Sequence, residues 1–291
     1  MRIKEALEFA STYLAERGLR LPQQDAEALV TMLLQKNRAF LYAHPEFELS
    51  RTNESVFHQW LNKRGEHYPI QYLRGKQEFY GLDFLVRPGV FIPRPETELL
   101  VDVSMALLRQ HPDINSCVAD VGTGSGCIAI TLARHNPNLT ITAIDISPTA
   151  LETAKQNAET HSCLGRIEFH ESSMLTAVKE RAGGYRLIVS NPPYVGLQDK
   201  AEVEPSVRKY EPGKAVFSGQ SGMEAYLQLF DQSGELLKPG GWLVLELGAN
   251  SLQPVISLGK QKNWRLNQAH SDLAGIERCA VFQRYSSDNT F

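Results

Sequence analysis

The first quarter of the chain repeats apolar residues at helical spacing. Ile3, Leu7, Ala10 and Leu14 recur every three or four positions, and Gly18 follows as a stop signal. Two further apolar stripes have the same spacing, namely Ala26, Leu29, Val30, Leu33 and Leu34, and then Phe57, Trp60 and Leu61. The pattern predicts a small bundle of three helices over residues 1–74.

The pattern changes after residue 75. Residues 78–92 alternate toward β structure around the turn Tyr80-Gly81-Leu82-Asp83, which predicts a linking β-hairpin over residues 75–92. Over residues 93–291 helices and strands alternate, which is typical of an α/β fold with a parallel sheet covered on both faces. The predicted strands comprise residues 117–119, 139–144, 167–169, 187–190, 242–247 and 279–285, the last of them a candidate antiparallel strand.

A stiff turn follows the strand predicted at 187–190. Its residues are Asn191-Pro192-Pro193-Tyr194. Neither proline has an N–H for the strand ladder, and each holds φ at about −65°, so the strand must end here. The turn therefore presents an amide side chain, carbonyl groups and an aromatic ring at the carboxyl edge of the sheet.

These groups can hold a planar amino group. The side-chain oxygen of Asn191 and the carbonyl of Pro192 can each accept one N–H, and the Tyr194 ring can stack on the plane. An amide nitrogen is a poor nucleophile because its lone pair is delocalised, and two acceptors on its hydrogens localise that lone pair. The alternative is a proline-stiffened loop without chemistry. A second motif upstream argues against that alternative because it supplies the missing electrophile.

The second motif is a glycine-rich turn between a predicted strand, 117–119, and a predicted helix, 127–134. The turn Gly122-Thr123-Gly124-Ser125-Gly126 lets the backbone approach a ligand closely. Its spacing, G-x-G-x-G, differs from the G-x-G-x-x-G of dinucleotide-binding proteins. Asp145 ends the next strand about 20 residues further on, where a carboxylate accepts both ribose hydroxyls.

Together these motifs resemble those of the Rossmann-like, S-adenosylmethionine-dependent methyltransferases. The N-P-P-Y turn narrows the resemblance to enzymes that methylate a planar amine or amide. Two further segments, Phe91-Ile92-Pro93-Arg94-Pro95-Glu96-Thr97-Glu98 and Arg208-Lys209-Tyr210-Glu211-Pro212, resemble the HemK/PrmC family of release factor protein-(glutamine-N5) methyltransferases. The resemblance covers nearly the whole chain and is weakest in residues 1–70.

The resemblance implies a function and a cofactor. The expected reaction is methylation, by S-adenosylmethionine, of the glutamine in the Gly-Gly-Gln motif of class I peptide-chain release factors, with residues 1–74 recognising the substrate. Asn191 and the glycine-rich turn would bind the cofactor, and Asn191 to Tyr194 the substrate amide. Arg94 and Glu96 would shape the substrate channel, the alternative being an ordinary ion pair.

The adenine contacts depart from the family pattern. Ser173 stands where family members usually have an acidic residue, and a serine bonds an amino group more weakly than a carboxylate does. Met174 would pack on the adenine face, although methionine is also common core filler. Asp120 either binds the methionine amino group of the cofactor or braces the glycine turn. Glu246, at the sheet edge, is expected to be functional.

Composition excludes several other classes of protein. With a net charge of −3, the chain is not built to coat nucleic acid. The four cysteines have neither metal-ligand spacing nor a disulfide framework, so we expect free thiols, a reducing compartment and no metal. No apolar run approaches the roughly 20 residues needed to cross a bilayer, and the N-terminus has no signal-peptide core. We expect a cytoplasmic monomer without membrane or nucleic-acid partners.

Rival functions remain open at this point. The chain could methylate a glutamine of ribosomal protein L3, although those relatives usually lack the P-E-T-E form. It could methylate adenine N6 in a nucleic acid, since that is also a planar amino group, but it lacks an added basic domain. A non-catalytic binding module and an NAD-dependent oxidoreductase are disfavoured, the first by the intact motifs and the second by the glycine spacing.

Overall fold

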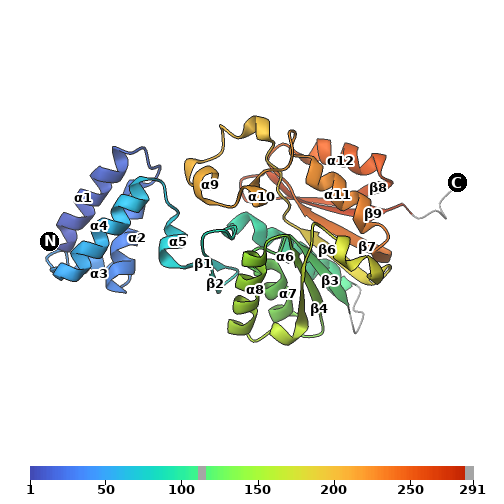
Figure 1. The fold of residues 1–291 in the computed structure, drawn as a ribbon, viewed down its shortest axis with the longest axis horizontal. Helices are drawn as coiled ribbons and strands as arrows, with labels where there is room; N and C mark the ends of the chain where they lie inside the picture. Colours follow the sequence, from blue (N-terminus) through green and yellow to red (C-terminus); the bar gives the residue numbers. More distant parts are fainter. Residues whose placement is uncertain (111–115, 286–291) are drawn as a thin grey trace. The chain divides into compact units, whose positions relative to one another are not determined.

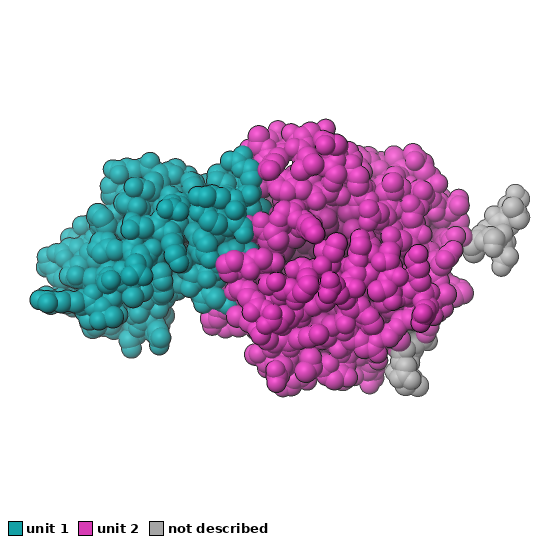
Figure 2. Space-filling model, viewed as in Figure 1, with its two compact units in different colours: residues 1–75, 204–210 teal, residues 76–203, 211–291 magenta. Residues whose placement is uncertain are grey.

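A computed structural model of the protein describes residues 1–110 and 116–285. The described chain divides into two compact units, coloured separately in Figure 2. Unit 1 contains residues 1–75 and 204–210, and unit 2 contains residues 76–203 and 211–291. The sequence-based division placed residues 204–210 in the methyltransferase domain, 93–291. Parts of that predicted domain, 111–115 and 286–291, lie outside the described residues.

Unit 1 is a helical bundle around one apolar core. Ile3, Ala6, Ala10 and Leu14 on its first helix are fully buried, as their helical spacing requires. Two short helices, α3 and α5, were not predicted from the periodicity, because each has too few residues to show one. The helices are α1 (Ile3–Ala15), α2 (Pro22–Leu34), α3 (Arg38–Ala43), α4 (Arg51–Gly65), α5 (Ile70–Arg74) and α9 (Pro205–Tyr210).

Helix α9 belongs to unit 1 although it follows the N-P-P-Y turn in sequence. The Tyr210 hydroxyl donates to the carbonyl of Glu66 at 3.0 Å, and the Tyr210 ring meets the Tyr68 ring edge-on at 5.0 Å between centroids. These contacts join segments 144 residues apart. The spacing of apolar residues along the sequence does not reveal a contact between such distant segments. The predicted domain boundaries therefore did not assign residues 204–210 to the N-terminal unit.

Unit 2 begins with a hairpin of β1 (Lys76–Phe79) and β2 (Leu82–Leu85). Tyr80 and Gly81 form the two-residue turn, and both have positive φ, as a tight hairpin turn demands. Pairing ends at Leu85, so the hairpin is shorter than the predicted 75–92. Phe79 and Phe84 are buried in the core of unit 2.

The other described strands of unit 2 form a seven-stranded sheet in the order β5-β4-β3-β6-β7-β9-β8. Neighbours among the first five strands are parallel, and β9 is antiparallel to both of its neighbours, as predicted (Figure 1). Strand β8 was not predicted, because most of its residues are polar. The strands are β3 (Cys117–Val121), β4 (Thr140–Asp145), β5 (Ile167–Glu171), β6 (Tyr185–Ser190), β7 (Leu237–Glu246), β8 (Trp264–Ser271) and β9 (Glu277–Arg284).

Alternate residues of the central strands feed two separate cores. Val118, Leu187 and Val244 face one side of the sheet, toward α6 and α7, whereas Ala119 and Ile188 face the other, toward α11 and α12. The sheet is therefore covered on both faces. The helices of unit 2 are η1 (Pro95–Thr97), α6 (Glu98–Gln110), α7 (Cys127–His135), α8 (Pro148–Thr160), η2 (Leu164–Arg166), η3 (Thr176–Arg181), η4 (Leu197–Asp199), α10 (Gly213–Val216), α11 (Glu224–Ser233) and α12 (Leu252–Gln261).

None of the helices in residues 1–110 and 116–285 is both long and apolar enough to span a membrane. Within the same residues, no three His, Cys, Asp or Glu side chains come together in a way that could hold a metal ion.

Candidate active site

The glycine-rich turn leaves the carboxyl end of β3 and enters α7. Gly122 has a φ of 76° and Gly126 a φ of 84°, a region that residues with a Cβ rarely adopt. At Gly126 an added Cβ would also come within 2.8 Å of the Ile130 side chain. The positive φ values and this close approach favour glycine at both positions. The backbone N–H groups of Gly122 and Thr123 donate to the Ile144 carbonyl, which holds the turn against the end of β4.

Asp145, at the end of β4, is joined to this turn. One carboxylate oxygen accepts the backbone N–H of Gly124 at 2.8 Å, and the other accepts that of Ser147 at 2.9 Å. Burial raises the pKa of Asp145, and the N–H groups that it accepts oppose that rise. Each carboxylate oxygen can accept a second hydrogen bond, so the side chain keeps capacity for the hydroxyls of a ligand.

Asp120 is fully buried behind the turn. Its Oδ2 accepts from the Thr123 hydroxyl at 2.7 Å and from the backbone N–H of Ala129 at 3.1 Å. Burial raises its pKa to about 7. Asp120 is not among the residues that line the cavity described below. Of the two roles predicted for it, these contacts support the brace.

The N-P-P-Y turn follows β6, the neighbour of β3. The Ser190 hydroxyl donates to the Val121 carbonyl at 2.7 Å, which ties the carboxyl ends of the two strands together. The side-chain Nδ2 of Asn191 donates to the hydroxyl of Thr97 at 3.1 Å. The sheet order thus brings the two sequence motifs, about 70 residues apart, to one edge.

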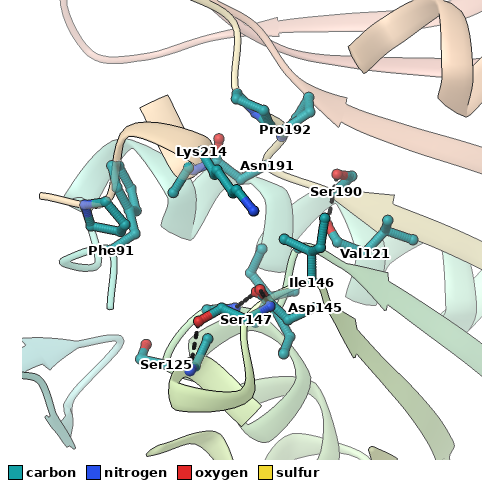
Figure 3. A pocket seen from close by; sticks show the side chains of 18 of the residues that line it. Phe91, Val121, Ser125, Asp145, Ile146, Ser147, Ser190, Asn191, Pro192 and Lys214 are labelled. Carbon is teal, nitrogen blue, oxygen red and sulfur yellow. Dashed lines mark hydrogen bonds between the residues drawn. The ribbon is translucent and has the colours of Figure 1, made fainter. Parts of the chain in front are cut away.

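A cavity of about 530 Å³ joins the two motifs (Figure 3). The glycine turn and Asp145 line one part of it, and Asn191, Pro192 and Pro193 line another. The volume is within the range of small-molecule sites. The remaining lining residues are Val121 and Ser190, at the ends of β3 and β6, and residues of five segments, within 89–97, 127–128, 146–150, 172–174 and 212–217.

Comparisons with known proteins agree with this geometry. The family model "PrmC N-terminal domain" matches residues 5–75, and the model "Methyltransferase small domain" matches residues 81–207. A release factor glutamine methyltransferase of Koribacter versatilis is 40% identical over 99% of this chain and 100% of its own length. That of Geobacter sulfurreducens is 34% identical over 95% of this chain and 94% of its own length. The chain belongs to the release factor glutamine methyltransferase family.

Solved structures show that about three quarters of the chain has the methyltransferase fold. The hMettl16 catalytic domain, solved in complex with a MAT2A 3′UTR hairpin, superposes with a TM-score of 0.52 at 15% identity, over 75% of this chain and 91% of that one. A methyltransferase from Pyrococcus furiosus gives a TM-score of 0.50 at 17% identity, over 76% of this chain and 97% of that one. At such identities the likeness concerns the fold alone.

The segment that carries the family's P-E-T-E residues is anchored by an ion pair. Arg94 pairs with Glu211, which is buried and also accepts the backbone N–H of Ile92 at 3.1 Å. The Arg94 guanidinium also lies 4.8 Å from the centre of the Phe91 ring. Arg94 is therefore held beside the cavity and is not among the residues that line it. Glu211 fastens the loop after the N-P-P-Y turn to the segment before α6.

Two other predicted substrate residues also lie outside the cavity lining. Glu96 is exposed. The Tyr194 ring packs against Gly248, where an added Cβ would come within 2.9 Å of a ring carbon, and burial raises its pKa to about 12. The structure thus places Asn191 to Pro193 at the cavity and turns the Tyr194 ring toward the core.

The predicted adenine contacts, Ser173 and Met174, both line the cavity. Ser173 is exposed, and its carbonyl accepts from the Thr176 hydroxyl at 2.9 Å. Met174 has a φ of 51°, a strained value for a residue with a long side chain, and strain of this kind is concentrated at functional sites.

Sequence reasoning missed several lining residues. Phe91 and Thr97 lay in the segment quoted for the resemblance, and Ile146 follows Asp145 directly, so proximity to a motif could have identified them. Lys214 and Phe217 line the cavity from α10 and its end, with no motif to mark them.

Proposed function

We propose that this protein methylates the side-chain amide nitrogen, N5, of the glutamine in the Gly-Gly-Gln motif of class I release factors, with S-adenosylmethionine as methyl donor. The observation that carries the proposal is that Asn191 and Pro192 line the same cavity as Gly122 to Ser125 and Asp145. The names of the relatives support the choice of substrate.

The cavity fits the proposed cofactor. Its volume suits a nucleoside with an amino-acid arm, and the half-buried Asp145 retains acceptor capacity for ribose hydroxyls. We assign cofactor binding to eight residues that line the cavity, Gly122, Thr123, Gly124, Ser125, Asp145, Ser173, Met174 and Asn191. We also assign it to Gly126, which ends the glycine turn and is not among the lining residues. When bound, S-adenosylmethionine supplies an electrophilic methyl carbon on a sulfonium.

The protein's own contribution is to orient and polarise the amide. The Asn191 side-chain oxygen and the Pro192 carbonyl would accept the two amide hydrogens and localise the nitrogen lone pair. The new N–C bond forms as the S–C bond breaks, and the nitrogen then loses one hydrogen as a proton to water. Holding the reacting atoms in line accounts for most of the acceleration, so no general base is assigned.

The substrate must enter a narrow site. A glutamine flanked by glycines can do so because neither neighbour has a side chain. We propose that Pro193 lines its path, that Arg94 and Glu96 shape the entrance, and that residues 1–74 hold the release factor by a second surface. Stacking by Tyr194 stays a prediction, since its ring would have to leave Gly248.

The test compares four substrates with isotopically labelled cofactor. They are an intact class I release factor, its Gln→Ala variant, ribosomal protein L3 and an adenine-containing oligonucleotide. Mass spectrometry should find the label on the intact release factor and not on the variant. A short Gly-Gly-Gln peptide should be a poor substrate. Label on L3 or on the oligonucleotide would reassign the substrate.

A further inference from the structure

Two buried side chains, Thr97 and Glu246, and the half-buried side chain of Asn191 form a hydrogen-bonded series at one end of the cavity. Asn191 Nδ2 donates to Thr97 Oγ1 at 3.1 Å, and Thr97 Oγ1 donates to Glu246 Oε2 at 2.6 Å. Thr97 is 2% exposed and Glu246 is 3% exposed. Thr97 ends η1, Glu246 ends β7 and Asn191 follows β6. These two hydrogen bonds therefore link the P-E-T-E segment to the N-P-P-Y turn at the edge of the sheet.

When Glu246 is ionised, only one assignment of donors and acceptors is possible for the hydrogen bonds that join Glu246, Thr97 and Asn191. A carboxylate only accepts, and a hydroxyl has one hydrogen with two lone pairs. The single Thr97 hydrogen is committed to Glu246, so Thr97 can offer only a lone pair to Asn191. The end of the Asn191 amide that faces Thr97 must therefore be its NH2 group, because hydrogen bonds decide which end of an amide is which.

This arrangement has a direct consequence for the proposed reaction. With its NH2 group bound to Thr97, Asn191 keeps its oxygen, Oδ1, as the acceptor for the substrate. A reversed amide would present NH2 to the NH2 of the glutamine, and two donors cannot bond. We propose that Thr97 and Glu246 are positioning residues that fix the Asn191 side chain with Oδ1 as the substrate acceptor. This inference rests on the proposed function.

Three substitutions separate this role from simple packing. Thr97→Val keeps the shape and removes the hydroxyl, and turnover should fall at least about tenfold. Thr97→Ser keeps the hydroxyl and should restore turnover to within about threefold of wild type. Thr131→Val is the matched control, since Thr131 is also a fully buried threonine and its hydroxyl has no hydrogen-bond partner among the described residues. Its turnover should stay within about twofold of wild type.

A double-mutant cycle decides whether Thr97 acts through Asn191. Because the two act as one unit, Thr97→Val should cause no further loss of turnover in an Asn191→Ala background, whereas independent roles would multiply the two losses. The Michaelis constant for the cofactor should stay near the wild-type value in Thr97→Val. Multiplied losses, or a full loss of turnover in Thr97→Ser, would overturn the proposal.

A second readout needs no substrate, so it distinguishes failure of this inference from failure of the proposed function. The side-chain amide signals of Asn191 are identified in nitrogen-15 NMR spectra as those lost in Asn191→Ala. These signals should shift in Thr97→Val and return near their original positions in Thr97→Ser. Signals unchanged in Thr97→Val would refute the link. If the signals shift but the enzyme leaves release factors unmodified, the hydrogen bond between Thr97 and Asn191 is supported and the proposed substrate is wrong.

Discussion

Gly124 donates its backbone N–H to Asp145 at 2.8 Å across 21 residues of sequence. The glycine turn and the acidic end of the next strand are therefore one structure. The contact lies at the carboxyl edge of a parallel sheet, where open α/β folds bind their ligands. It also means that a change at Asp145 alters both the ligand contacts and the turn.

Removing the Asp145 carboxylate should weaken cofactor binding. Asp145→Ala should cost on the order of 1–3 kcal/mol of binding free energy, because charge-assisted hydrogen bonds to the ribose are lost. Titration calorimetry with S-adenosylmethionine measures the loss. Asp231→Ala is the control, since that carboxylate pairs with Lys262 away from the cavity. A protein stabilised by NAD and not by S-adenosylmethionine would contradict the assignment.

Asn191→Ala should separate binding from chemistry. Turnover should fall at least about a hundredfold, the scale seen when one preorganised transition-state contact is removed. Cofactor affinity should fall far less than turnover, because Asp145 and the glycine turn, which supply the other cofactor contacts, stay in place. Single-turnover kinetics and calorimetry on the same preparation make the comparison. Near-normal turnover would show that the Asn191 oxygen is not an acceptor for the reacting amide.

Turnover should rise with pH through about 7. Burial raises the pKa of Glu246 to about 7. The charge of Glu96 adds to this rise, whereas the hydrogen bond from Thr97 and the charges of Arg278 and Arg94 oppose it. The charge of Glu246 in turn helps to raise the pKa of Tyr194. Below that pH, a protonated Glu246 can donate to Thr97, which frees the Thr97 hydrogen for Asn191 and permits the reversed amide.

The control for this pH dependence is Glu246→Gln, which cannot ionise. Its turnover should be lower than that of the wild type, and the inflection near neutral pH should be absent. Rates measured from pH 5.5 to 8.5 at saturating cofactor give both profiles. An unchanged inflection in the variant would assign the titration to another group.

The contribution of Asp120 to the stability of the ligand-free protein should fall as pH rises between about 4 and 7. An ordinary Asp has a pKa of about 3.9, and burial raises that of Asp120 to about 7. In that window the folded protein holds a proton that the unfolded chain has lost, so raising the pH favours unfolding.

Asp120→Asn isolates this contribution to stability. Oδ2 accepts both hydrogen bonds of the side chain and Oδ1 has no hydrogen-bond partner among the described residues, so an amide can replace the carboxyl without losing an acceptor. Urea unfolding at pH 5, 6, 7 and 8 should show a shallower pH dependence for the variant. Equal slopes in the two proteins would mean that Asp120 does not titrate in this range.

The sequence by itself determined the features that depend on neighbouring residues. Gly122 and Gly126 can adopt a positive φ because glycine has no Cβ, whatever surrounds them. The two prolines after β6 likewise end the strand whatever its place in the sheet. The helical spacing of apolar residues likewise predicted most of the N-terminal bundle. The alternation of helical segments with short apolar runs predicted the α/β sheet. These rules act over a few residues, so they can be recognised without knowing the fold.

Tertiary structure alone decided which distant side chains meet. Thr97 bonds to Asn191 across 94 residues and to Glu246 across 149, and Arg94 reaches Glu211 across 117. The Tyr194 ring turned toward Gly248 because β6 and β7 are neighbours in the sheet. Such contacts depend on strand order and on the packing of whole helices. No local pattern encodes either, so the hydrogen-bonded series that orients Asn191 could be seen only in the folded protein.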